Sequence, residues 1–335
     1  MIRPVSAFLL SLLLTAATAL GQAKPVPTPN ARVVKDPPRA DHHQHVASPT
    51  MVVFQGLANQ GITAITAQDV IKLLDAAGIR RAVLLSTAYA YGRPGREPQD
   101  EYARVKTEND WAGSQAALFP ERLIAFCGFN PLKDYALDEI ARCARDPNLR
   151  RGIKLHFGNS DVQLENPQHL EKLKAVFRAA NANGMAIVVH ARASISLKRP
   201  YGAEQARLFL ENLLPLATNI TVQIAHLAGS GPGYDDPKAD AALEVYIDAI
   251  AKRDPRVRNL WFDLTSNAYP ANPPERTALL AKRIRAIGVG RVLYGTDLTI
   301  GTNLSPFDAW AEVRRLDLSA KEIDTIAKNK APYLR

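Results

Sequence analysis

The residues of this sequence that are best placed to do chemistry together are His43 and His45, in the segment RADHHQHV. Side chains two residues apart on a β-strand point to the same face, so a strand at this point would present two imidazoles side by side. Paired imidazoles are good ligands for a divalent metal ion. An H-x-H pair is nevertheless common by chance, and alone it predicts only a candidate site.

Three more ionisable residues stand where apolar runs of the sequence end. His190 ends the run in AIVVHAR, His226 ends the run in VQIAHLAG, and Asp297 ends VLYGTD. Each could be an isolated polar residue that bonds to a loop. Buried ionisable groups are costly unless they are paired or coordinated, so several of them converging at one place favour a bound cation.

A closed (β/α)8 barrel, the TIM-barrel type of α/β fold, would bring these residues together. From Arg39 onward, eight β-branched or apolar runs alternate with segments of helical periodicity, as expected of repeated βα units. The runs begin at residues 39, 80, 122, 151, 185, 220, 259 and 291. Barrel enzymes place their active sites at the C-terminal ends of the strands, which is where the histidines and Asp297 lie in these runs.

The chain is expected to have three parts: a secretory signal peptide (residues 1–23), a proline-rich tether (residues 24–38) and the barrel domain (residues 39–335). Arg3 provides a positive start, an apolar stretch follows, and small residues precede position 24. The apolar stretch is shorter than the roughly 20 residues of a spanning helix. Cleavage, with export to the periplasm or secretion and no stable membrane insertion, is therefore favoured over a membrane anchor.

Composition narrows the functional classes. The 42 Lys and Arg residues exceed the 33 Asp and Glu residues, which gives a net charge of +9, but the basic residues are scattered. No stretch interleaves basic and aromatic residues, so we expect no nucleic-acid partner and a bias toward anionic small molecules. Two cysteines, Cys127 and Cys143, exclude a disulfide framework and permit one bridge. Walker A, G-x-G-x-x-G and G-x-S-x-G motifs are absent.

Taken in order, these motifs resemble those of the amidohydrolase superfamily, and within it the amidohydrolase-2 group. DHHQH is similar to the group's D-x-H-x-H on the first strand, and GIKLH is similar to its fourth-strand segment. VVHAR, IAHLAG and YGTD are similar to strands five, six and eight, and NKAPYL is similar to part of the terminal helix. The resemblance spans the whole domain and implies a barrel of the metal-dependent hydrolase type. It is much less specific for the substrate.

The resemblance also implies roles for individual residues. His43, His45, His190 and Asp297 would bind one divalent metal ion, predicted to be Zn²⁺, which would activate a water molecule. Asp297 would accept the proton of this water and pass it to the leaving group. His226 would orient the water or polarise the substrate. These last two residues are the predicted catalytic groups.

Lys154, His156 and Arg192 are predicted to bind the substrate. Lys154 and His156 share one face of the fourth strand, and Arg192 shares the inward face with His190, where it could hold a carboxylate in a bidentate pair. In binuclear relatives a fourth-strand lysine is carboxylated and bridges two metal ions. In that case a second ion would bind, and Lys154 and His226 would be ligands. A group of residues after the second strand either lines the same mouth or forms a solvated loop: Tyr89, Tyr91, Arg93 and Arg96.

The leading functional prediction is hydrolysis of a C–N or C–O bond in a small, anionic molecule such as an amide, lactone or ester. The alternative is a non-oxidative decarboxylase or hydratase of a small carboxylic acid at the same metal site. A barrel that binds a ligand without catalysis is less favoured, because no expected site residue is missing. Some lactone-hydrolysing relatives work without metal, so the residues predict metal binding more than metal dependence. The resemblance also predicts a homodimer.

Overall fold

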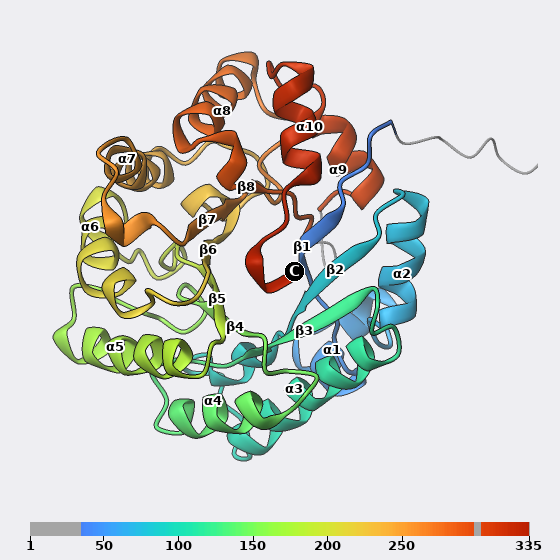
Figure 1. Cartoon of the computed structure of the whole chain (residues 1–335). Coiled ribbons are helices and arrows are strands. Elements are labelled where there is room, and N and C mark those ends of the chain that lie inside the picture. Colours follow the sequence, from blue (N-terminus) through green and yellow to red (C-terminus); the bar gives the residue numbers. More distant parts are fainter. Residues whose placement is uncertain (1–34, 298–302, 335) are drawn as a thin grey trace, which may run out of the picture. The chain divides into compact units, whose positions relative to one another are not determined.

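Eight parallel strands form a barrel in the computed structural model, which describes residues 35–297 and 303–334 (Figure 1). The strands pair in sequence order, and backbone hydrogen bonds from His42 to Tyr294 (2.9 Å) and from Asp297 to His43 (2.7 Å) join the segment that follows the last strand to the first strand. The predicted (β/α)8 barrel is confirmed. All eight predicted runs contain a strand: β1 (Ala40–Gln44), β2 (Arg81–Leu85), β3 (Leu123–Gly128), β4 (Gly152–His156), β5 (Ala186–His190), β6 (Val222–Ile224), β7 (Leu260–Asp263) and β8 (Val292–Leu293).

Helices surround the barrel because their apolar stripes pack on the outer face of the strands. Polar residues start several of them: Thr66 and Ser319 form capping boxes with Asp69 and Glu322, which satisfies backbone N–H groups that the helix leaves free. The α-helices are α1 (Pro49–Phe54), α2 (Ala67–Ala76), α3 (Glu101–Ala117), α4 (Ala136–Arg145), α5 (Pro167–Ala182), α6 (Ala203–Asn212), α7 (Pro237–Ala251), α8 (Pro274–Ile287), α9 (Pro306–Val313) and α10 (Ala320–Lys328).

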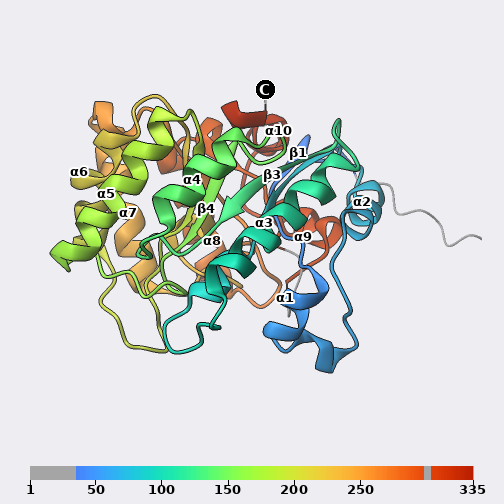
Figure 2. The same cartoon turned by 90° about the horizontal axis from the view of Figure 1, so that it is seen from below.

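The C-terminal segment fills one end of the barrel (Figure 1). Its short helix η7 (Pro332–Leu334) packs on strand residues such as Phe126, whose ring centroid lies 5.1 Å from that of Tyr333. The buried Tyr333 hydroxyl donates to Gln223, and Arg81 donates to the Leu334 carbonyl (2.6 Å). Figure 2 shows the C-terminus and α1 at opposite ends of the barrel, so the loops around α1 belong to the other end.

Removing the Tyr333 hydroxyl is expected to destabilise the barrel. In Tyr333→Phe the buried side-chain oxygen of Gln223 would lose its donor, and an unsatisfied buried acceptor costs about 1–3 kcal/mol. Urea denaturation should show a free energy of unfolding lowered by that amount, with an unchanged m-value. An unchanged midpoint would mean that this hydrogen bond does not secure the segment.

The predicted signal peptide and most of the tether lie outside the described residues. Among residues 35–297 and 303–334, no helix is long and apolar enough to cross a membrane. Cys127 on β3 and Cys143 on α4 form a disulfide, which is the single bridge that the sequence permitted. The bridge fastens a surrounding helix to a barrel strand at a buried position.

Candidate functional site

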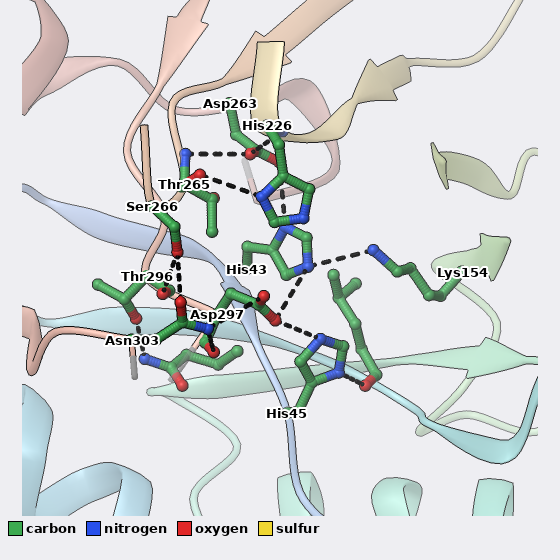
Figure 3. A network of polar contacts seen from close by, with 12 residues as sticks. His43, His45, Lys154, His226, Asp263, Thr265, Ser266, Thr296, Asp297 and Asn303 are labelled. Carbon is green, nitrogen blue, oxygen red and sulfur yellow. Dashed lines mark hydrogen bonds and ion pairs between the residues drawn. The ribbon is translucent and has the colours of Figure 1, made fainter. Parts of the chain in front are cut away.

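Three of the predicted metal ligands meet at the C-terminal ends of β1 and β8 (Figure 3). One ligand atom each from His43, His45 and Asp297 lies within 4.8 Å of the others. The Asp297 carboxylate is 2.9 Å from Nε2 of His45 and 3.6 Å from Nε2 of His43. Both imidazoles are buried, whereas the Asp297 side chain is 24% exposed and therefore faces the mouth of the barrel.

The backbone of β1 and of the segment after β8 is shaped to bring these groups together. Pairing between β1 and β2 is irregular between Asp41 and Gln44, as is common beside active sites. Asp297 adopts a left-handed conformation (φ 55°), and its N–H donates to the His43 carbonyl at 2.7 Å. A side chain at Gly295 would collide with Oγ1 of Thr265 and approach Cβ of His43 to 2.8 Å, so glycine permits the close approach of the segment after β8 to β1.

Asp263, the last residue of β7, contacts His43 of the three-residue cluster and was not predicted from the sequence. It is fully buried, and its carboxylate accepts hydrogen bonds from Nδ1 of His43 (3.2 Å), from Gln223 (2.6 Å) and from the backbone of His226 (2.9 Å). The available signal was its place at the end of the apolar run LWFD, equivalent to that of His190 in AIVVH. Such carboxylates fix the orientation of metal-binding histidines.

His226 lies just beyond β6 in an unusual turn. His226, Leu227 and Ala228 all have positive φ angles (54°, 49° and 68°), which cost energy in residues other than glycine. Asp263 accepts the N–H of His226, and Asn267 donates to its carbonyl at 3.2 Å, so buried side chains hold the turn. Strain of this kind concentrates at functional sites. The turn places the His226 ring 4.9 Å from the His43 ring, between centroids.

Lys154, His156 and His190 line the β4 and β5 side of the centre. Nζ of the buried Lys154 is 3.1 Å from Nε2 of His43 (Figure 3), and burial lowers the Lys154 pKa to about 8. His190 stacks on His156 at 4.0 Å between ring centroids, and its Nε2 is 3.3 Å from the Ser230 hydroxyl. Among the described residues, His190 is therefore beside the three-residue cluster rather than within it. Its role as a fourth ligand stays a prediction.

The protonation pattern of the cluster suits a divalent cation. Burial lowers the pKa of His43 to about 3, so its imidazole is neutral at physiological pH. Nδ1 of His43 faces Asp263, so the lone pair of this neutral ring is on Nε2, which accepts from Nζ of Lys154. Nδ1 of His45 faces the Leu85 carbonyl at 2.5 Å, which leaves its Nε2 toward Asp297. The neutral imidazole of His43, the imidazole of His45 and the Asp297 carboxylate are ligands that fit a metal such as zinc or manganese.

Two cavities open beside the cluster, with volumes of about 350 and 370 Å³. His45 and Asp297 line the first cavity, whereas His190 and Arg192 line the second. Arg192, predicted to bind a substrate carboxylate, instead donates to Asp236 at 2.6 Å and lies 4.7 Å above the Tyr201 ring. Its contact with substrate stays a prediction, but its charge is already balanced within the chain.

The segment after β2 lines the mouth of the barrel, so it is not a solvated loop, which was the other possibility from the sequence. Tyr89, Arg93 and Arg96 border the first cavity, and the Tyr89 ring lies 5.0 Å from that of His156, between centroids. Tyr91 does not border either cavity, because it packs on Phe54 at 4.6 Å. Tyr89 and Tyr91 are buried within the short helix η2 (Ala88–Gly92).

A sequence profile described as amidohydrolase matches residues 40–329. No curated protein matches the sequence significantly.

Several solved structures share the fold. The 5-carboxyvanillate decarboxylase of Sphingomonas paucimobilis is 16% identical, with a TM-score of 0.58, over 87% of this chain and 96% of that chain. A dihydroxybenzoic acid decarboxylase from Polaromonas, with bound manganese and 2-nitroresorcinol, is 16% identical, with a TM-score of 0.58 over 87% and 95%. A probable 2-pyrone-4,6-dicarboxylic acid hydrolase from Acinetobacter baumannii is 16% identical, with a TM-score of 0.54 over 86% and 95%.

Proposed function

The chain belongs to the amidohydrolase family, and from this premise we propose that it is a metal-dependent decarboxylase of a small aromatic or enolic carboxylic acid. The observation that carries the proposal is the convergence of His43, His45 and Asp297 beside a cavity bordered by arginines. Decarboxylases of this fold support decarboxylation over hydrolysis of a C–N or C–O bond, the first choice from the sequence.

A divalent ion held by His43, His45 and Asp297 would polarise a substrate oxygen as a Lewis acid. The chain's own groups would orient the acid and move one proton. Asp297 borders the cavity and is the ionisable group that we assign to this transfer. The bond between carbon and carboxylate breaks and carbon dioxide leaves. The electron pair left on carbon takes a proton that the Asp297 carboxylate first accepts from a solvent water molecule, which leaves hydroxide. His226 would position the substrate. Its Nδ1 faces the Thr265 carbonyl (3.0 Å), and its Nε2 forms no hydrogen bond with a described residue, so this nitrogen is available to a substrate.

Metal removal tests the proposal directly. Treatment with a chelator is expected to lower the rate of carbon dioxide release from hydroxybenzoate substrates at least about a hundredfold, because the site loses the Lewis-acid ion that polarises and orients the substrate. Restoring one equivalent of zinc or manganese should restore the rate, and elemental analysis of the untreated protein identifies the native ion. Product analysis by mass spectrometry includes a lactone and an amide panel. A hydrolysed product without carbon dioxide would replace decarboxylation with the hydrolase alternative.

Four finer expectations belong to this proposal. Zinc is the proposed ion because imidazoles bind it well, with manganese as the competing result. Two ions per chain would place a carboxylated Lys154 among the ligands.

We also propose that the protein is exported and that residues 1–23 are its signal peptide. The Cys127–Cys143 bridge is compatible with an oxidising compartment, and sequencing the N-terminus of the mature protein tests the cleavage. A homodimer is proposed, and sedimentation equilibrium tests it.

A further inference from the structure

Arg93 is the arginine at the mouth whose charge has no partner in the described part of the chain. Its side chain makes no hydrogen bond or ion pair with residues 35–297 or 303–334 and is exposed. The other two arginines of the cavities are engaged: Arg192 with Asp236 at 2.6 Å, and Arg96 with the Phe54 carbonyl at 3.3 Å. Arg93 is therefore the cation most available to a ligand.

Arg93 also stands where the two cavities meet. His156, Asn159 and Arg93 line both cavities, so a ligand in either cavity would lie beside Arg93. Asp297 is the only acidic side chain among the described residues that line either cavity. Since Asp297 belongs to the metal cluster, no nearby lining carboxylate of residues 35–297 or 303–334 competes for Arg93.

Two buried polar atoms on the cavity walls lack hydrogen-bond partners within the described chain. They are Oγ1 of Thr87, a residue only 4% exposed, and Oδ1 of Asn159. A buried polar group without a partner is costly, so such groups on a cavity wall indicate a polar ligand or ordered water. The Thr87 hydroxyl can donate to an anionic oxygen, and the Tyr89 side chain borders the same space.

The charge balance at the metal centre indicates which group of the substrate Arg93 would bind. A divalent ion with the Asp297 carboxylate leaves one positive charge, because the adjacent Asp263 and Lys154 carry opposite charges that cancel. The carboxylate lost in the reaction would neutralise this charge. Arg93 lies on the shared wall, apart from the three-residue cluster, and remains positively charged. We propose, resting on the decarboxylase function above, that the substrate is a dianion whose second anionic group is bound by Arg93. Arg93 is thus the specificity-determining residue of this site.

The test measures binding of isophthalate and terephthalate, and of the monomethyl ester of each, to the metal-loaded protein by isothermal titration calorimetry. Each ester keeps the ring and one carboxylate but lacks the second charge. At least one diacid is expected to bind wild-type protein about tenfold more tightly than its ester, because charge-assisted pairing with arginine is lost in the ester. Arg93→Gln should reduce that ratio to about twofold or less.

Arg207→Gln is the matched control, because this arginine of α6 is exposed and lines neither cavity. It should keep the wild-type ratio. No diacid preference in the wild type, or a preference that survives Arg93→Gln, would overturn the inference. The readout needs no turnover, so a protein that prefers diacids through Arg93 but releases no carbon dioxide would refute only the decarboxylase function.

Discussion

Replacing Asp297 by Asn is expected to lower the turnover rate about a thousandfold or more and to reduce bound metal well below one ion per chain. The substitution removes the one carboxylate of the three-residue cluster and the proposed proton carrier together. General acid–base catalysis alone contributes about 10²–10⁴ in rate. Stopped assays of carbon dioxide release and elemental analysis of the same preparation measure the two effects.

The fold should survive this change, which makes the result interpretable. Asp297 has a φ of 55°, and asparagine tolerates the left-handed region at least as well as aspartate. The thermal transition of metal-free Asp297→Asn is therefore expected to match that of metal-free wild type. Asp134→Asn is the control, because this side chain is 99% exposed and pairs with Lys172 at the surface. Wild-type rate and metal content in Asp297→Asn would remove Asp297 from both roles.

Asp263→Asn is expected to weaken metal binding about 10- to 100-fold, although Asp263 is not one of the three clustered ligands. Its carboxylate accepts from Nδ1 of His43, from the Gln223 amide and from the His226 backbone. An asparagine of equal size would turn an NH2 group toward at least one of these donors and leave a buried group unsatisfied. His43 would lose the acceptor that holds its Nε2 toward the metal.

Competition with a chelating dye gives the metal dissociation constant, and rates at saturating metal separate binding from positioning. If Asp263 only orients His43, excess metal should recover most of the rate. A rate that stays low at saturation would show that the strained turn at His226 also depends on this carboxylate. An unchanged metal dissociation constant would contradict the positioning role. Asp235→Asn, at an exposed position (74% of the side chain), provides the control.

The amino-acid sequence by itself determined the barrel and the face on which its site lies. Each β-branched run became a strand because it can be buried on both faces, and the intervening segments of helical periodicity, each with one apolar stripe, cover the outside. Residues at the ends of different strands converge in any such barrel, which is why His43, His45 and Asp297 could be grouped across more than 250 residues of chain.

Only the tertiary structure decided which polar residues serve the site and how. Asp263 is a polar residue at the end of a strand, as His156 and His190 are. Its importance arises from a contact with His43, which is 220 residues away in the chain. Arg192 lies two residues after β5, and Arg93 directly follows η2. Asp236, from the start of α7, pairs with Arg192 and leaves Arg93 available. Such differences depend on which long-range partner reaches each side chain, and local periodicity contains no information about that pairing.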